Sequence, residues 1–380
     1  METRNPIDLL THKRFDVVIK YLYASNLSSG FFKNAYKEHL GIWNGFTEDK
    51  RKKSTFEDFD NSFISMINNN VDEPVPVNPE GHLANGAHRL AAALYRQRPI
   101  NIRSTTKKEN YPIEADYKVF LRKGLQKHIL GRTALEYAKL KPNTHVICLF
   151  PIAHTRMDEV MNIIEKHSNI FYTSSEGLTA PGQIGLIKEI YLSEGWVSEK
   201  GIRKKCQQCF RGMAQVTFVL IDAKNLETVK EMKKEIRALF KVGNHSVHIN
   251  DYHVDTVRIA KTVFNDNSIH FLNKRRDVLF PNYKKLMSGK KPDDNTIITG
   301  STVLSLYGLR DCKDVDLIYL NNPPADSHNQ YLGNLYKLTL DAIFNNPKYH
   351  LYYNGLQYVS LDVIKNMKKM RNEPQDVIDV

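Results

Sequence analysis

Cysteine, long apolar runs and an apolar leader are scarce or missing in this sequence, and each scarcity excludes a class of protein. Four cysteines in 380 residues are too few and too unevenly placed for a disulfide framework. No window approaches the run of about 20 apolar residues that a membrane-spanning helix needs. Residues 1–6 also lack the apolar core of a signal peptide. We therefore expect a cytoplasmic protein without a membrane span.

Negative charge is also in short supply. Lys and Arg number 54 against 42 Asp and Glu, which gives a formal net charge of +12 and favours anionic partners. Such partners include nucleic acid, nucleotides and small phosphorylated metabolites. The basic residues form short clusters, typical of solvated faces, rather than one tail or stripe, at residues 51–53, 203–205, 274–276 and 365–371.

The cysteines could still have formed a metal or redox site. Cys206 and Cys209 form a Cys-x-x-Cys pair, but no second pair with zinc-ligand spacing follows. The neighbours Lys205, Gln207 and Gln208 predict an exposed helix. We expect free thiols at this position.

The length exceeds that of one ordinary core and favours three domains. We predict an α/β and α+β multidomain fold, divided into residues 1–140, 141–273 and 274–380. Residues 14–70 have apolar spacing typical of helices, and a short strand is expected at 75–77. A tight turn at Gly86 then leads into an alanine-rich helix.

From residue 144 the pattern alternates between strands and helices, which predicts an α/β middle domain. Strands are expected at 146–152, 170–173, 216–221 and 247–249, and helices at 157–167, 184–196, 226–240 and 254–264. A basic connection at 274–294 precedes the last domain. There we expect strands at 296–299 and 315–320 around a helix at 302–309, and a hairpin at Asn354-Gly355 between 349–353 and 356–360.

The last domain carries the residues that most directly indicate chemistry. Asp314 and Asp316 are two apart on an expected strand, which puts both carboxylates on one face, as needed to hold one or two Mg²⁺ ions. Gly300 lets the backbone approach a phosphate, and Ser301, at the start of the following helix, offers a hydroxyl and an amide to phosphate oxygens.

This order of strand, Gly-Ser, helix and Asp-x-Asp resembles the DNA polymerase β-like nucleotidyltransferase superfamily over residues 295–320. The ending with Lys368, Arg371 and Asp376 is similar to the basic-then-acidic tail of bacterial members. The resemblance implies Mg²⁺ and a nucleoside triphosphate as substrate, with Asp314 and Asp316 as catalytic and metal-binding residues. A third carboxylate, usual in that superfamily, is missing from the expected strands, and Asp362 is expected to open a helix instead.

A second candidate anion site lies at the N-terminal turn. Asn85, Gly86, His88 and Arg89 precede or begin a helix, whose free amides and arginine suit a phosphate. Residues 74–103 resemble the ParB/sulfiredoxin-like family, whose Asp-Gly-x-His-Arg segment binds nucleotide phosphates. Ala87 stands in place of the reactive sulfiredoxin cysteine and Asn85 in place of the family's aspartate, so binding is better supported than catalysis. A local backbone contact is the alternative role of His88.

The middle domain has two weaker candidates. His245, His248 and His253 lie within nine residues, and a strand end there could bind metal or phosphate. Because no Cys or Glu partners accompany the histidines, polar edge residues are the favoured explanation over a metal site. Residues 174–177 and 179–182 could form a phosphate loop before the next helix, with a plain turn as the alternative.

Together these features predict a Mg²⁺-dependent transferase. It would move a nucleotidyl or phosphoryl group from a nucleoside triphosphate to a small hydroxylated acceptor, such as a sugar of a surface-glycan pathway. One alternative is a nucleic-acid-binding or regulatory protein with nucleotide sites, which the net charge favours. The other is a ParB-like small-molecule kinase with a degenerate C-terminal domain, against which Asn85 argues.

Overall fold

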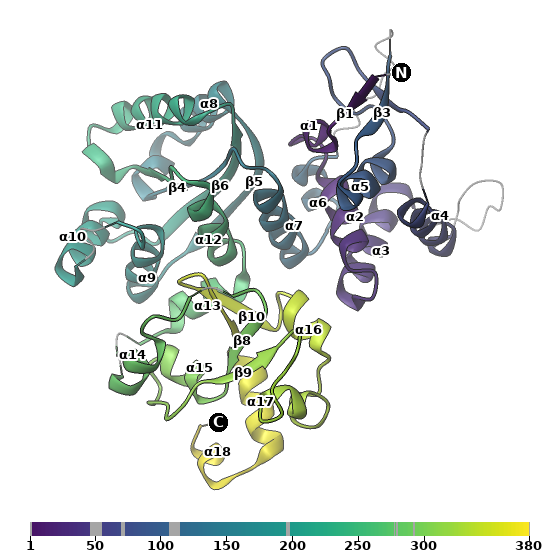
Figure 1. Cartoon of the computed structure of the whole chain (residues 1–380). Coiled ribbons are helices and arrows are strands. Elements are labelled where there is room, and N and C mark those ends of the chain that lie inside the picture. The colour runs from purple at the N-terminus through teal and green to yellow at the C-terminus, as the bar shows by residue number, and fades with distance from the viewer. Residues whose placement is uncertain are drawn as a thin grey trace. The chain divides into compact units, whose positions relative to one another are not determined.

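The structure, a computed structural model, describes residues 2–45, 55–69, 73–105, 115–194, 198–276, 278, 280–291 and 293–379. It is a mixed α/β chain that divides into two compact units, Met1–Pro142 and Asn143–Val380 (Figure 1). Helices and three small sheets contribute to these units. The basic cluster at 51–53 and the expected helix end at residue 196 lie outside the described residues.

The first unit packs helices around a three-stranded sheet of order β1-β3-β2. Strand β3 pairs antiparallel with β1 and parallel with β2, so β2, α5 and β3 form a βαβ unit. The elements are β1 (Glu2–Arg4), α1 (Pro6–Leu9), α2 (Phe15–Ser25), α3 (Gly30–Asn44), α4 (Phe56–Asn68), β2 (Val75–Val77), α5 (Ala87–Arg96), β3 (Ile100–Ser104), α6 (Tyr117–Arg122) and α7 (Lys127–Leu140).

Aromatic side chains from separate helices form the core of this unit. Tyr23 on α2 stacks on Tyr36 of α3 with ring centroids 5.0 Å apart, and Phe63 of α4 lies 5.5 Å from Tyr36. Each such ring removes a large apolar area from water, and deleting one typically costs about 3–5 kcal/mol. The helices predicted within 14–70 are present as α2, α3 and α4, residues 46–54 and 70 of that range lie outside the described residues, and the strand predicted at 75–77 is confirmed.

The second unit begins with a four-stranded sheet of order β5-β6-β4-β7. All neighbouring strands in this sheet are antiparallel. The strand order and these directions together are those of the split βαβ arrangement of ferredoxin-like sheets. The elements are β4 (Thr144–Leu149), η1 (Pro151–Arg156), α8 (Met157–His167), β5 (Ser168–Gly177), α9 (Ala180–Ile190), α10 (Glu199–Phe210), β6 (Gln215–Ala223), α11 (Leu226–Phe240), η2 (Gly243–His245), β7 (Val247–Ile249), α12 (His253–Val263) and α13 (Asp266–Lys274).

A second sheet of this unit has the order β10-β11-β8-β9. Strand β8 pairs parallel with β11 and antiparallel with β9. Its elements are α14 (Pro281–Met287), β8 (Thr296–Thr299), α15 (Ser301–Leu306), β9 (Asp316–Tyr319), η3 (His328–Tyr331), the π-helix η4 (Leu332–Tyr336), α16 (Leu340–Asn345), β10 (His350–Tyr353), β11 (Leu356–Val359), α17 (Leu361–Arg371) and α18 (Pro374–Asp379).

The hairpin predicted at Asn354-Gly355 is confirmed. Strands β10 and β11 pair antiparallel on either side of these two residues. Both residues have positive φ, 51° and 76°, as a two-residue primed turn requires.

Several predicted features differ from the structure. Residues 174–177 belong to β5 rather than to a loop, and Thr179 caps α9, which covers 180–190 instead of 184–196. Cys206 and Cys209 lie on a helix, as expected, but both side chains are buried, because that face of α10 packs inward. All four cysteines are free thiols.

None of the helices in the described ranges combines the length and the apolar character that crossing a bilayer requires.

Candidate functional site

Gly300 and Asp316 lie against each other at one end of the second sheet. Strands β8 and β9 pair in a register that places Thr299 opposite Asp316, so Gly300 follows directly beside the carboxylate. Gly300 has φ 64° and ψ −146°, a conformation that is open almost exclusively to glycine. A Cβ built on Gly300 would lie 2.9 Å from Cγ of Asp316 and closer still to Oδ2. The glycine is therefore what allows this carboxylate to approach the backbone.

A chain of polar contacts reaches Asp316 from the other side. Nε2 of His328 lies 3.1 Å from Oδ1 of Asp316, and Nδ1 of His328 lies 2.9 Å from the hydroxyl of Tyr336. That hydroxyl is 2.7 Å from Oγ1 of Thr299. One proton arrangement satisfies the two hydrogen bonds: Thr299 donates to the Tyr336 hydroxyl, and Tyr336 donates to Nδ1 of His328. Burial raises the pKa of Tyr336, so its hydroxyl keeps the proton that this arrangement needs.

Asp314 takes a different position from the one expected. Strand β9 begins at Asp316, so Asp314 lies in the preceding bend with an exposed side chain and not on the strand. Its carbonyl accepts a hydrogen bond from Oγ1 of Thr302 at 3.0 Å, which ties the bend to α15. Ser301 is the first residue of α15 and is half-buried.

The metal-ligand set is small. Within the described residues, no group of three or more His, Cys, Asp or Glu side chains converges as a metal site would require. Strands β10 and β11 carry no carboxylate, and Asp362 lies in the first turn of α17, as expected. One or two carboxylates together with substrate phosphates nevertheless form a common Mg²⁺ environment, and Asp316, 27% exposed, suits that role.

The tail residues form a buried ion-pair cluster. Nζ of Lys368 lies 2.7 Å from Oδ1 of Asp376 and 2.8 Å from Oδ2 of Asp379. Arg371 donates to both oxygens of Asp376, at 2.7 Å each. The Asp376 carboxylate, with smaller contributions from Glu373 and Asp316, raises the pKa of Arg371. This cluster holds α18 onto α17 and keeps a guanidinium in the electrostatic reach of Asp316.

The N-terminal turn forms a separate candidate site in the first unit. Asn85, Gly86, His88 and Arg89 all line one cavity of about 280 Å³. Gly86 has φ 95° and is the residue before α5, as predicted, and a Cβ there would lie 2.7 Å from Cγ1 of Val75. The expected strand, turn and helix are thus present.

Two side chains of this turn already have protein partners. Nε2 of His88 lies 2.9 Å from the hydroxyl of Tyr36, and its ring packs edge-on against Phe63. Nη1 of Arg89 donates to the carbonyl of Pro74 at 3.1 Å and lies 3.0 Å from Oε2 of Glu73. Arg89 would have to leave the Glu73 carboxylate to bind a phosphate with its full fork of donors.

Three charged residues that sequence reasoning missed lie at the floor of this cavity. Arg14 donates to both oxygens of Asp16 at 2.9 Å, and Nζ of Lys20 lies 3.0 Å from Oδ2 of Asp16. All three are buried, and Lys20 also lies 3.1 Å from Nε2 of His39. Burial alone would raise the pKa of Asp16, but Arg14 and Lys20 outweigh it and hold this pKa well below its ordinary value. The available signal in the sequence was one acidic and one basic residue, Asp16 and Lys20, four positions apart within an apolar helix.

The three middle histidines do not converge. His248 is buried on β7, His245 ends η2 with Nδ1 3.9 Å from Sγ of Cys209, and His253 begins α12. The sheet is antiparallel, so the rule that places sites at the carboxyl ends of parallel strands does not apply here. A three-histidine metal site is absent among the described residues.

Comparisons of the chain with models of known protein families, with curated proteins and with solved structures each find no match.

Proposed function

We propose that this chain transfers a nucleotidyl or phosphoryl group from a nucleoside triphosphate to a small hydroxylated acceptor, with Mg²⁺ held at Asp316. The observation that carries the proposal is the close approach of Gly300 to the Asp316 carboxylate. The missing Cβ lets the Asp316 carboxylate lie against the backbone at the start of α15, and one carboxylate together with substrate phosphates is a common Mg²⁺ environment. Resemblance to the DNA polymerase β-like nucleotidyltransferases supports the same reaction.

The roles of the residues follow from their contacts. Bound Mg²⁺ supplies neutralisation of the triphosphate charge. Asp316 presents Oδ2 beside Gly300, while Nε2 of His328 contacts Oδ1 at 3.1 Å on the other side of the carboxylate. Ser301 follows Gly300 at the start of α15 and offers its hydroxyl and amide to a phosphate oxygen. Asp314, exposed in the preceding bend, is the second carboxylate of the proposal.

The remaining parts of the hypothesis belong to the same proposal. The first unit is proposed to be a ParB-like domain that binds nucleotide phosphates at Gly86, because the four residues named by the resemblance share one cavity. The acceptor is proposed to be a sugar, and the location the cytoplasm, where the four free thiols suit a reducing environment.

A labelled-nucleotide assay tests the reaction. Purified chain is incubated with Mg²⁺, a panel of hydroxylated sugars, and a triphosphate labelled at either the α or the γ phosphorus. Transfer of the α label indicates nucleotidyl transfer, and transfer of the γ label indicates phosphoryl transfer. Asp316→Asn is expected to lower the rate at least 100-fold, whereas the exposed Asp326→Asn in the same domain leaves it unchanged. Equal rates in the two variants would defeat the assignment.

A nucleic-acid-binding protein is the second candidate, and the net charge of +12 favours it. Such binding weakens steeply with salt, because each neutralised phosphate releases counterions. Tight binding of DNA or RNA with a steep salt slope, together with no transfer of either label, would favour this candidate over the transferase.

A further inference from the structure

A larger cavity lies apart from the proposed transfer site, on the first sheet of the second unit. Its volume is about 710 Å³, and its wall comes from the end of α9, from α10 and α11, and from β7 with the start of α12. A cavity of this size accommodates a small organic molecule rather than a bare ion. Ile190, Ile249 and the rings of Tyr191 and Tyr252 contribute apolar surface, and Tyr252 is 68% exposed.

Most of the negative charge in the wall is already neutralised. Oδ1 of Asp251 accepts from Nζ of Lys233 at 2.8 Å, and Oδ1 of Asp255 accepts from Nη2 of Arg258 at 2.8 Å. Glu194 is the third carboxylate among the described residues that line the cavity.

Three of the positively charged side chains in the wall have no carboxylate partner in the described part of the chain. Lys204, Lys205 and Arg237 line the cavity, and none of them has a carboxylate within ion-pair distance in the part of the chain that the structure describes. Nζ of Lys205 donates to the carbonyl of Asn244 at 2.8 Å instead. The wall as a whole carries four cations, Lys204, Lys205, Lys233 and Arg237, against three carboxylates, and the surplus positive charge favours an anionic group such as the phosphate of a monoester.

Two buried nitrogens in this wall have no partner within the described chain. Nε of Arg237 and Nε2 of His248 are both buried and make no hydrogen bond there. His248 is 8% exposed and packs edge-on against Tyr191, with ring centroids 4.6 Å apart. Burial, together with Lys233 and Lys205, lowers the pKa of His248 to about 3, so its ring is neutral. An unsatisfied buried polar group is costly in a protein, and a ligand in the cavity would satisfy both nitrogens.

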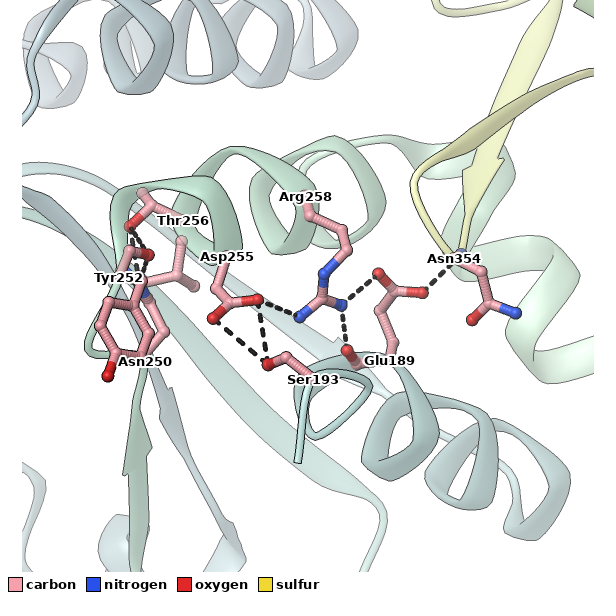
Figure 2. A network of polar contacts seen from close by, with 9 residues as sticks. Glu189, Ser193, Asn250, Tyr252, Asp255, Thr256, Arg258 and Asn354 are labelled. Atoms are coloured by element: carbon pink, nitrogen blue, oxygen red, sulfur yellow. Dashed lines mark hydrogen bonds and ion pairs between the residues drawn. The ribbon is translucent and has the colours of Figure 1, made fainter. Parts of the chain in front are cut away.

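One part of the wall is held rigidly by a single amide. Oδ1 of Asn250 accepts from the backbone N of Val146 at 2.8 Å. Nδ2 of Asn250 donates to Oγ1 of Thr256 at 2.7 Å and to the carbonyl of Tyr252 at 2.8 Å, as Figure 2 shows for the last two contacts. The turn from β7 into α12 is therefore fixed before any ligand binds.

A second network joins the start of α12 to the end of α9 (Figure 2). Ser193 donates to Asp255 at 3.3 Å. Arg258 lies between Asp255 and Glu189: it donates to the carboxylate of each and also to the backbone carbonyl of Glu189. Oε2 of the buried Glu189 accepts from the backbone N of Asn354 at 2.7 Å, in the β10–β11 hairpin. These two networks fix the shape of the cavity without using the side chains of Lys205, Arg237 or His248.

We propose that this cavity binds a small organic phosphate, a phosphomonoester of nucleotide or sugar-phosphate size, with its phosphate held by Arg237, Lys205 and His248. The unpaired cations suit the phosphate, and the apolar surface of Ile190, Ile249 and Tyr252 suits the organic part.

Measuring the binding of phosphomonoesters to the full chain in EDTA tests the proposal, because EDTA removes Mg²⁺ and so prevents binding at a site that depends on it. Calorimetric titrations use a panel of nucleoside monophosphates and sugar phosphates, their unphosphorylated counterparts, inorganic phosphate and citrate. At least one phosphomonoester is expected to bind at least tenfold more tightly than its unphosphorylated counterpart, than inorganic phosphate and than citrate. Binding of no phosphomonoester, or equal binding of citrate, overturns the proposal.

A matched pair of variants on α11 locates the ligand. Arg237→Met is expected to weaken phosphomonoester binding at least tenfold, whereas the exposed Lys234→Met, in the same helix but outside the cavity wall, leaves binding unchanged. Without ligand, Arg237→Met is expected to melt at the same or a higher temperature, because it removes a half-buried cation whose Nε makes no hydrogen bond within the described chain. Unchanged affinity in Arg237→Met contradicts the proposal.

A third variant distinguishes binding in this cavity from binding at the proposed transfer site. Asp316→Asn is expected to keep wild-type affinity for the phosphomonoester. Loss of binding in Asp316→Asn would place the ligand at the transfer site, so this proposal would be wrong while the proposed function stands.

Discussion

At the scale of single residues, Gly300 is the position where one added carbon has the largest expected consequence. Gly300→Ala introduces a Cβ within 2.9 Å of Cγ of Asp316 and forces an alanine into a conformation that costs about 1–3 kcal/mol. We expect Gly300→Ala to lower the free energy of unfolding by more than this amount and to abolish transfer, because Asp316 must move. Urea unfolding and the labelled-nucleotide assay measure the two effects.

Gly289→Ala is the control for backbone conformation. Gly289 also has positive φ, 78°, but an added Cβ there would meet no atom within 4 Å. This variant should cost roughly 1 kcal/mol and keep full activity. Equal behaviour of the two variants would show that contact with Asp316 is irrelevant.

The buried charges at the N-terminal cavity make a prediction about pH. The pKa of Asp16 is lower in the folded chain than in the unfolded chain, where it is about 3.9. Its contribution to stability is therefore complete above about pH 4 and is lost as the pH falls further. Asp16→Asn leaves Arg14 and Lys20 buried without a counter-charge and should cost about 3–5 kcal/mol at pH 7.

Unfolding of wild type and Asp16→Asn in urea between pH 2.5 and 7 measures this effect. The difference between the two should shrink toward the acid end, whereas the exposed Asp8→Asn stays close to wild type throughout. A constant difference across this range would contradict the assigned ion pair.

Single residues also show how far the site could be predicted. Gly300 and Asp316 were identified from residue type and spacing, because a strand, a glycine and an acidic strand start are local features. His328 and Tyr336 were missed. They lie 12 and 20 residues after Asp316, on a 3₁₀ turn and a π-helix that bring them back to the carboxylate, and no local pattern predicts such a return.

At the scale of elements, the last two helices depend on one carboxylate. Asp376→Asn removes the partner that Lys368 and Arg371 share, although Asp379 still lies 2.8 Å from Nζ of Lys368. We expect a loss of about 3 kcal/mol, the lower end of the range for breaking a buried pair. Limited proteolysis should then cut α18 first.

Glu373→Gln is the matched control, because Glu373 is an exposed partner of the same Arg371 at 3.4 Å. Exposed pairs contribute about 0–1 kcal/mol, so this variant should resist protease like wild type. Release of α18 in both variants, or in neither, would show that the ion pairs do not hold it.

The elements themselves were largely predictable, but their directions were not. Helices α8 and α11 and strands β7 and β8 have the expected bounds, because their apolar spacing is regular and their ends are marked by polar residues. Strand β4 is buried along its whole length, and strands buried on both faces are typical of parallel sheets. Here the same burial occurs in an antiparallel sheet, since burial on both faces does not depend on strand direction.

At the scale of the whole molecule, the two compact units predict two unfolding events. Asp16 lies in Met1–Pro142 and Asp376 in Asn143–Val380. Differential scanning calorimetry of the full chain should resolve two transitions, with Asp16→Asn lowering one and Asp376→Asn lowering the other. A single transition that both variants lower equally would contradict this division.

The central claim is that Mg²⁺ and a polyphosphate bind together where Gly300 meets Asp316. The most direct measurement is the melting temperature of the full chain with a panel of nucleoside triphosphates, with and without Mg²⁺, in wild type, Asp316→Asn and Asp326→Asn. The account predicts a rise for at least one triphosphate that requires Mg²⁺, persists in Asp326→Asn and disappears in Asp316→Asn. A rise of the same size in Asp316→Asn, or one that needs no Mg²⁺, would contradict it.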